Sequence, residues 1–149
     1  MLQQVSEVAA DEGLTYDLEH ARGGNTEDAH RVLHAAAAQG GTALQGKVKE
    51  RLLQGYFCER ENISDPRTLV RLGVEAGLGA AQAEAALQGD AFRADVAADQ
   101  AQARAFGATG VPFFVLNRTY GVSGAQPLEV FGDVLTRAWA DIDAIGSPA

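Results

Sequence analysis

The sequence predicts an α-rich α/β protein in which a long helical segment interrupts a small sheet. Helix is expected to dominate because Ala, Leu, Gln and Glu are abundant and apolar residues recur at spacings of three and four. Two stretches depart from that period. Residues 14–18 alternate between apolar and polar side chains, and residues 111–116 form one continuous apolar run. Both patterns are typical of short strands, and the segment between them is predicted to be helical throughout.

The chain opens on a predicted helix that is followed by a predicted strand. Residues 2–9 carry an apolar stripe at helical spacing. This helix is expected to end at Gly13, because glycine accepts the left-handed conformation common at helix ends. The period then changes to two, since Leu14, Tyr16 and Leu18 alternate with polar residues.

About five helical pieces are predicted within the central segment. Asn25 or Thr26 can cap the first piece, which should end at the glycine pair 40–41. Asp65 followed by Pro66 predicts another helix start, because the carboxylate can accept an N–H of the first turn and proline loses no hydrogen bond there. Further boundaries are expected at Gly77, Ala80, Gln88, Asp90 and Gly107.

The last part of the chain is predicted to be a hairpin and a helix. The apolar run 111–116 fits a strand that is covered on both faces. A tight turn at 117–118 can return residues 120–123 antiparallel to it. Either Arg118 adopts the left-handed conformation, at a cost of about 1 kcal/mol, or the loop is longer. A helix that begins at Pro127 is expected to cover one face of the sheet. Its apolar side comprises Leu128, Phe131, Leu135, Ala138, Trp139 and Ile142.

Composition excludes several classes of function. The 149 residues carry 12 Lys+Arg and 20 Asp+Glu, a net charge of -8. This acidic balance argues against nucleic acid and anionic membranes as partners. No apolar run approaches the length of a membrane span, and no basic leader is evident, so we expect a cytoplasmic protein. The single cysteine allows no internal disulfide.

The histidines do not predict a metal site. His30 and His34 lie four residues apart on one predicted helix, a spacing that places two imidazoles on the same face. Zinc needs three or four converging ligands, and only the distant His20 remains. We therefore expect His30 to be a packed or capping residue and His34 to be half exposed. No metal or cofactor is predicted.

Other candidates for chemistry are equally weak. Cys58 lies beside Glu59 and close to Glu61, and nearby carboxylates disfavour the reactive thiolate. The glycines of residues 107–110 lack the lysine of a phosphate-binding loop. Ser123 has no glycine elbow before a helix. None of these residues is predicted to be catalytic.

The Val111-Pro112 pair is the most informative local feature. Proline is excluded from central strands unless it stands at the first position or at a special turn. A trans bond at a strand edge is the common case. A cis bond would leave the main-chain N–H and C=O of Val111 free to pair with an extended peptide. The residue types alone leave both geometries open.

Three blocks of sequence together resemble the DsbA-like thioredoxin family, and its FrnE-type branch in particular. The blocks are residues 25–31, residues 110–115 and residues 120–127, with Tyr56-Phe57 and residues 62–65 between them. The similarity covers nearly the whole chain. It implies one thioredoxin-like domain over residues 1–149, incomplete at its N-terminus, with an all-helical insertion over residues 25–107.

The resemblance also implies an activity and a site. Relatives are thiol–disulfide oxidoreductases that act on protein or small-thiol substrates. Gly110, Val111 and Pro112 match the family's cis-proline loop, which helps to hold a substrate strand. Asn25, Asp28, His30 and Arg31 match the motif that borders the active-site cleft, at the joint with the helical insertion. These residues are the candidate substrate-binding and cleft-lining residues.

The sequence departs from the family at its redox motif. Relatives begin with a strand and a Cys-x-x-Cys at a helix start, where the helix dipole favours the attacking thiolate. This sequence has neither feature, and Cys58 alone lacks a second thiol to resolve a mixed disulfide. We therefore expect the chain to be redox-inactive as it stands, with no catalytic residue.

The missing N-terminal strand and redox motif also determine the expected partners and the alternative functions. The missing strand would lie between residues 14–18 and residues 112–116, so two open edges are expected to favour a homodimer or a strand-swapped dimer. A non-catalytic peptide-binding module that uses the same loop is one alternative. Another is a glutathione-dependent hydroxychromene carboxylate isomerase, whose N-terminal serine this sequence also lacks.

Overall fold

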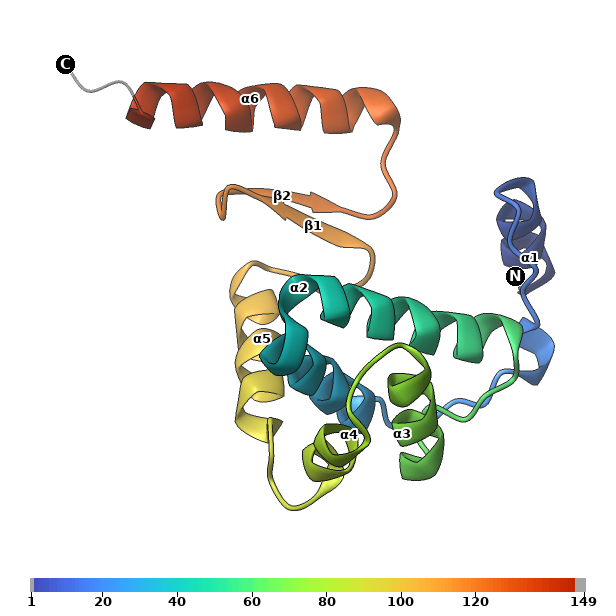
Figure 1. The fold of residues 1–149 in the computed structure, drawn as a ribbon. Coiled ribbons are helices and arrows are strands. Elements are labelled where there is room, and N and C mark those ends of the chain that lie inside the picture. The colour runs from blue at the N-terminus through green and yellow to red at the C-terminus, as the bar shows by residue number, and fades with distance from the viewer. Residues whose placement is uncertain (1, 147–149) are drawn as a thin grey trace. The chain divides into compact units, whose positions relative to one another are not determined.

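The computed structural model describes residues 2–146, with side chains through Ile142. Within these residues it contains helices and a two-stranded sheet, in the order shown in Figure 1. The elements are α1 Leu2–Asp11, η1 Leu18–His20, α2 Glu27–Cys58, α3 Pro66–Glu75, α4 Ala80–Leu87, α5 Arg93–Ala105, β1 Phe113–Leu116, β2 Tyr120–Ser123 and α6 Leu128–Gly146. The chain divides into two compact units between Ala97 and Ala98. None of the described helices is both long and apolar enough to cross a membrane.

The first unit is a helical assembly whose core lies between α2, α3 and α4. Val32 and Val48 of α2 are fully buried, as are Leu69 and Leu72 of α3. Burying each such side chain stabilises the fold by about 1.5–3 kcal/mol. The core therefore packs both halves of α2 against the two shorter helices.

α2 consists of two arms that meet at a kink. Gly40 has φ -142° and ψ 22°, and Gly41 has φ 64° and ψ -162°. The conformation of Gly41 is essentially restricted to glycine. The predicted break at this glycine pair is confirmed, although the helix resumes directly after it.

α3 begins as the sequence predicts. Asp65 accepts the Thr68 N–H at 3.2 Å and the Thr68 hydroxyl at 3.1 Å, and Pro66 occupies the first turn. Burial alone would raise the pKa of the Asp65 carboxyl, but the hydrogen bonds from Thr68 together with the Arg67 charge and backbone N–H hold the pKa below its usual value. The cap is thus made by an ionised carboxylate at neutral pH.

Arg31 is a buried charged residue of the helical unit, with 1% of its surface exposed. Its guanidinium donates to the carbonyls of Ala91 (2.7 Å), Gln88 (3.2 Å) and Gly89 (2.9 Å) and to Asp28 Oδ1 (2.7 Å). The carbonyls belong to the loop between α4 and α5. In that loop Phe92 has φ 59°, a left-handed backbone that is rare for an aromatic residue. Arg31 therefore holds a conformationally costly loop in place.

The strand predicted over residues 14–18 is wrong. Residues 14–17 have no regular secondary structure, and Leu18 begins η1. A strand needs a hydrogen-bonded neighbour, whereas here the Asp17 N–H donates to the Phe57 carbonyl at 2.7 Å. The Tyr16 ring stacks on Phe57 with centroids 4.9 Å apart. Leu14 is 46% exposed and the polar Asp17 is half-buried, so the alternating pattern does not correspond to one covered face.

The second unit contains the predicted hairpin. β1 and β2 pair antiparallel, with Phe113 opposite Ser123 and Leu116 opposite Tyr120. The turn places Asn117 at φ 50° and Arg118 at φ 56°, so both central residues are left-handed. This is the type of turn that matches the twist of a two-stranded ribbon. The left-handed conformation expected for Arg118 is confirmed.

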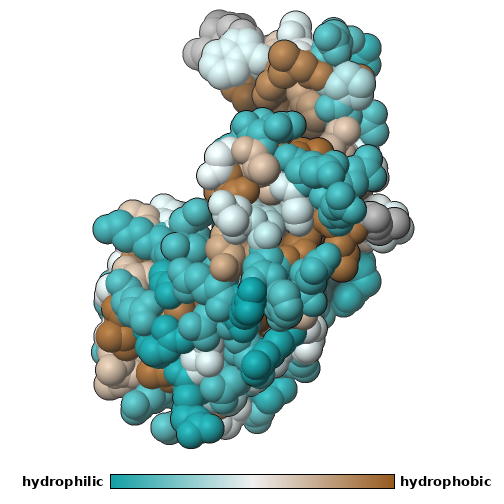
Figure 2. Space-filling view, turned by 90° about the vertical axis from the view of Figure 1, so that its right-hand side faces the viewer, coloured by the Kyte–Doolittle hydropathy of each residue, from teal (hydrophilic) through white to brown (hydrophobic). Residues whose placement is uncertain are grey.

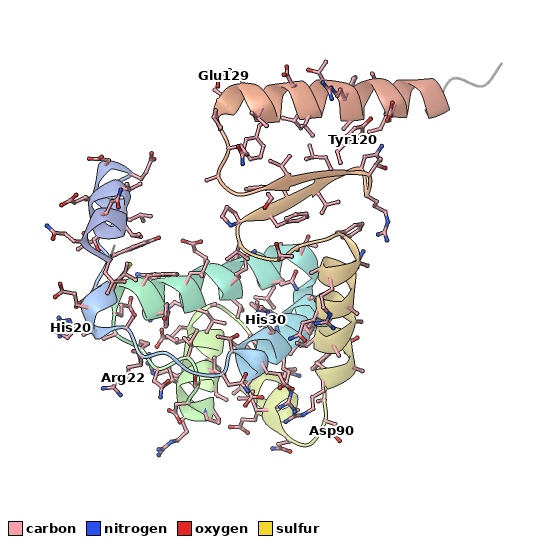
Figure 3. The ribbon with its side chains drawn as sticks, turned by 180° about the vertical axis from the view of Figure 1, so that it is seen from behind. His20, Arg22, His30, Asp90, Tyr120 and Glu129 are labelled. Carbon is pink, nitrogen blue, oxygen red and sulfur yellow. The ribbon has the colours of Figure 1, made fainter. Side chains whose placement is uncertain are left out.

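α6 covers one face of this hairpin. The Phe131 ring meets Phe114 edge-on, with centroids 5.0 Å apart. The Tyr120 hydroxyl, labelled in Figure 3 on the hairpin, donates to Asp141 Oδ2 at 2.7 Å. This hydrogen bond to a carboxylate raises the pKa of Tyr120. The last helix therefore lies on one face of the hairpin as predicted, but most of its predicted apolar side is not covered: Leu128, Leu135, Trp139 and Ile142 are exposed.

The expectation that β1 is covered on both faces is wrong. Phe114 is 43% exposed and Val115 is 36% exposed. α6 packs on the Phe114 side of β1, whereas Phe113 and Val115 line an open groove. Leu135 and Trp139 of α6 are exposed as well, and hydrophobic side chains reach the surface of α6 at the top of Figure 2.

Candidate functional site

The loop before β1 is tethered at both ends and bare in its middle. The Ala108 N–H donates to the Ala103 carbonyl at 3.0 Å, and the Gly124 N–H donates to the Pro112 carbonyl at 2.8 Å. Between them the Val111–Pro112 peptide bond is cis, and Val111 is 95% exposed. Within the part of the chain that the structure describes, the N–H and C=O of Val111 have no hydrogen-bond partner. Both groups are available to a ligand.

The strand register leaves further main-chain groups unpaired on β1. Pro112 accepts a hydrogen bond from the β2 side. Because the pattern of an antiparallel pair alternates, the N–H and C=O of Phe113 and Val115 point to the opposite edge. No described strand pairs there. We call the row of main-chain groups at Val111, Phe113 and Val115 the β1 ledge.

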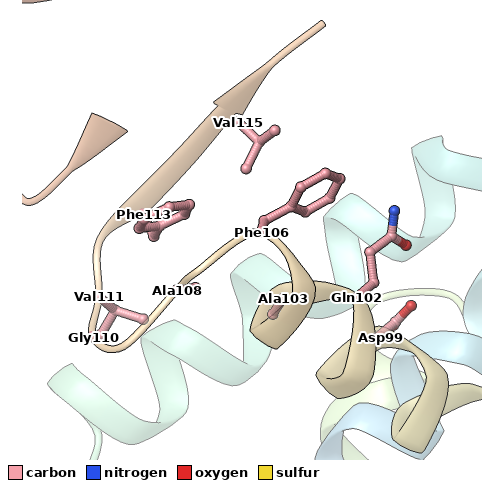
Figure 4. Close-up of a pocket in the computed structure, with 9 residues that line it drawn as sticks. All are labelled: Asp99, Gln102, Ala103, Phe106, Ala108, Gly110, Val111, Phe113 and Val115. Atoms are coloured by element: carbon pink, nitrogen blue, oxygen red, sulfur yellow. The ribbon is translucent and has the colours of Figure 1, made fainter. Parts of the chain in front are cut away.

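An open groove of about 380 Å³ lies beside the β1 ledge (Figure 4). Its lining residues are Asp99, Gln102, Ala103, Phe106, Ala108, Gly110, Val111, Phe113 and Val115. All of them belong to the second unit. Most of the lining is apolar, and Asp99 and Gln102 supply the polar side chains. The groove can therefore accept an apolar side chain.

Arg118 ties the hairpin turn to the helical side of the groove. Its guanidinium carbon lies 5.5 Å from the centre of the Phe106 ring, within the range of a cation–π contact. With the Gln102 amide oriented to satisfy its neighbours, the Gln102 oxygen accepts from the two terminal nitrogens of Arg118 at 3.1 and 3.2 Å. These contacts hold the two sides of the groove together.

The β1 ledge and the groove together provide the features that recognition of an extended peptide needs. A peptide that adds to a sheet edge gains affinity from main-chain hydrogen bonds and specificity from pockets for alternate side chains. The ledge supplies the first feature and the groove the second. Of the predicted substrate-binding residues, Gly110 and Val111 line this groove and Pro112 lies directly before β1.

The sequence of this chain matches the model of a known protein family. A family model described as a DSBA-like thioredoxin domain matches residues 1–136. This chain is a member of the DsbA-like thioredoxin family.

A solved relative of this DsbA-like chain supports the assignment. The crystal structure of a probable DsbA oxidoreductase from Streptomyces coelicolor is 40% identical in sequence, with a TM-score of 0.85. The match covers 99% of this chain and 61% of that chain, so this chain spans about three fifths of the relative's length. No curated protein is significantly similar. The predicted DsbA-like thioredoxin fold is confirmed.

The candidate cleft residues of this DsbA-like chain all lie in the helical unit. Asn25 Oδ1 accepts the Glu27 N–H at 2.9 Å and so serves the start of α2. Asp28 and Arg31 pair with each other, and Arg31 is taken up by internal hydrogen bonds. His30 is exposed. A role for these residues beside the redox centre stays a prediction.

Cys58 of the DsbA-like chain is a free, partly exposed thiol at the end of α2. The two carboxylates that were expected to act on it have other partners. Glu59 pairs with Arg51 at 2.9 Å, and Glu61 pairs with Arg71. The expectation that Glu59 and Glu61 disfavour the Cys58 thiolate therefore overlooked the two arginines that pair with these carboxylates.

The described part of the DsbA-like chain contains no group of three or more side chains that could hold a metal ion. His34 stacks against Phe92, with ring centroids 6.3 Å apart. Sequence reasoning missed the helical wall of the groove. It identified Arg118 as a turn residue, but nothing in the spacing indicates that Arg118 meets Phe106.

Proposed function

We propose that this chain is the substrate-binding part of a FrnE-type, DsbA-like thiol–disulfide oxidoreductase. In this proposal the β1 ledge captures an extended segment of a substrate protein. The observation that carries the proposal is the fully exposed Val111, whose main-chain N–H and C=O are unpartnered at the mouth of an apolar groove. The similarity to a probable DsbA oxidoreductase supports the reaction class.

Dithiol–disulfide exchange sets the chemical requirement. A thiolate attacks a substrate disulfide, a new enzyme–substrate disulfide forms, and the other substrate sulfur leaves as a thiolate. A second enzyme thiol then attacks that mixed disulfide, which releases the substrate as a dithiol and leaves the two enzyme sulfurs oxidised. The sequence holds one cysteine, so these residues can perform at most the first step. We propose that the chain binds substrate without turnover.

This chain alone is expected not to catalyse the reduction of a protein disulfide. This chain should leave the rate of insulin reduction by dithiothreitol at its uncatalysed value, because Cys58 has no resolving partner in the sequence. The measurement is the turbidity of precipitating insulin B chain, with thioredoxin as the positive control. Cys58→Ser is the matched variant and should behave like the parent chain. Acceleration by the parent that Cys58→Ser abolishes would contradict the proposal.

A peptide-binding module without redox chemistry is the second candidate function. The β1 ledge favours it independently of any thiol, because strand addition needs only main-chain groups and pockets. The same open edge supports the expectation that the chain self-associates. A second copy and a peptide would then compete for the β1 ledge, so added peptide should shift a dimer toward monomer in light scattering.

A further inference from the structure

A second cavity lies within the helical unit, apart from the β1 ledge. It has a volume of about 210 Å³ and lies between the two arms of α2 and the segment before α3. Its floor is apolar: Ala29 and Leu52 are buried, and Leu33 and Ile63 are half-buried. Nothing in the proposed peptide capture uses this cavity.

Polar groups without partners surround that apolar floor. Thr26 stands at the start of α2, yet its side chain makes no capping hydrogen bond. His30 and Lys49 line the cavity from the two arms of α2, and both are exposed. Among the described residues, neither side chain has a hydrogen-bond or ion-pair partner. Figure 3 labels His30 on the first arm.

We infer that this cavity is a binding site for a small monocarboxylate with an aromatic or branched apolar body. An apolar pocket with a few convergent polar groups is the usual form of a small-molecule site. Here the apolar floor takes the body of the ligand, and the carboxylate accepts hydrogen bonds from the Lys49 ammonium and the Thr26 hydroxyl. His30 supplies a further donor at the same rim.

Size and charge both select this class of ligand. An engineered apolar cavity of about 150 Å³ in another protein takes up benzene, so a volume of about 210 Å³ suits a single ring with a short polar substituent. A cationic ligand is disfavoured because Lys49 would repel it. A neutral apolar ligand would gain nothing from the Lys49 ammonium.

The test uses phenylacetate as the probe, with the uncharged phenylacetamide as its isosteric control. Binding to the full chain is followed by amide chemical shifts in ¹H–¹⁵N spectra and by saturation transfer to the ligand. We expect phenylacetate to bind about twofold to fivefold more tightly than phenylacetamide, with the largest shifts at Ala29, Leu33 and Ile63.

Two lysines on the second arm of α2 give a matched pair of variants. Lys49→Gln removes the ammonium at the cavity and should abolish the preference for phenylacetate. Lys47→Gln removes an exposed ammonium two residues away, outside the cavity lining, and should preserve the preference. Equal binding of the two probes, equal effects of the two substitutions, or no saturable shifts at the cavity would overturn the inference. Far-ultraviolet circular dichroism confirms that both variants fold.

Discussion

Replacing Arg31 with alanine is expected to lower the free energy of unfolding by about 2–3 kcal/mol. The side chain is buried, and the substitution would leave the carbonyls of Gln88, Gly89 and Ala91 without their donor. Gln88 and Gly89 are exposed, so water can replace part of what these carbonyls lose, and the expected cost is that of hydrogen bonds to a charged donor. The Asp28 carboxylate would lose its cationic partner as well. Urea denaturation followed by circular dichroism at 222 nm measures the change.

Two further substitutions separate this effect from a general loss of charge. Lys47→Ala removes an exposed cation from the same helix and should change the free energy of unfolding by less than about 0.5 kcal/mol. Arg31→Lys keeps the charge, but one ammonium cannot reproduce the planar fork that reaches the carbonyls after α4. The free energy of unfolding of the Arg31→Lys protein should therefore lie between those of the parent and of the Arg31→Ala protein. An Arg31→Ala protein as stable as the Lys47→Ala protein would contradict the assigned role.

Replacing Ala103 with glutamate is expected to weaken peptide binding at least tenfold. Ala103 lies on the helical side of the groove, so the new carboxylate would stand where an apolar side chain of the ligand is proposed to insert. Burying that carboxylate without a partner is costly, and Asp99 four residues earlier adds like charge. The probe is an acetylated, amidated heptapeptide in which valine or leucine alternates with threonine. Isothermal titration calorimetry measures its affinity.

Ala101→Glu is the matched control on the same helix. Ala101 and Ala103 are both exposed, and glutamate is a good helix former, so both variants should fold normally. Ala101 does not line the groove and should tolerate the change with less than a twofold loss of affinity. If both substitutions weaken binding equally, the effect is one of net charge and the groove is not the site.

Local chemistry explains which elements could be predicted from the sequence. The Asp65-Pro66 start, the break at Gly40-Gly41 and the left-handed Arg118 turn each depend on residues within a few positions of one another. The strand predicted over residues 14–18 is wrong because an alternating pattern does not supply the hydrogen-bonded neighbour that a strand needs. Here the end of α2 covers Tyr16, and no described strand pairs with this segment.

The candidate site could be predicted from the sequence only where its residues carry a local signal. Val111-Pro112 carries a local signal, because proline before an apolar run restricts where the strand can begin. The wall of the groove carries none, since the contact between Arg118 and Phe106 joins residues whose separation has no periodic meaning. Arg31 was recognised as part of a motif, but its burial depends on carbonyls 57, 58 and 60 residues away.

The proposed capture of a peptide at the β1 ledge depends most on the main-chain N–H and C=O of Val111. Hydrogen exchange of the Val111 amide, measured by NMR with and without the heptapeptide, tests this directly. We predict that saturating peptide slows exchange at Val111 at least tenfold. A peptide that is N-methylated at its central residues should bind weakly and give no such protection. Saturable binding of the unmodified peptide with unchanged exchange at Val111 would contradict the account.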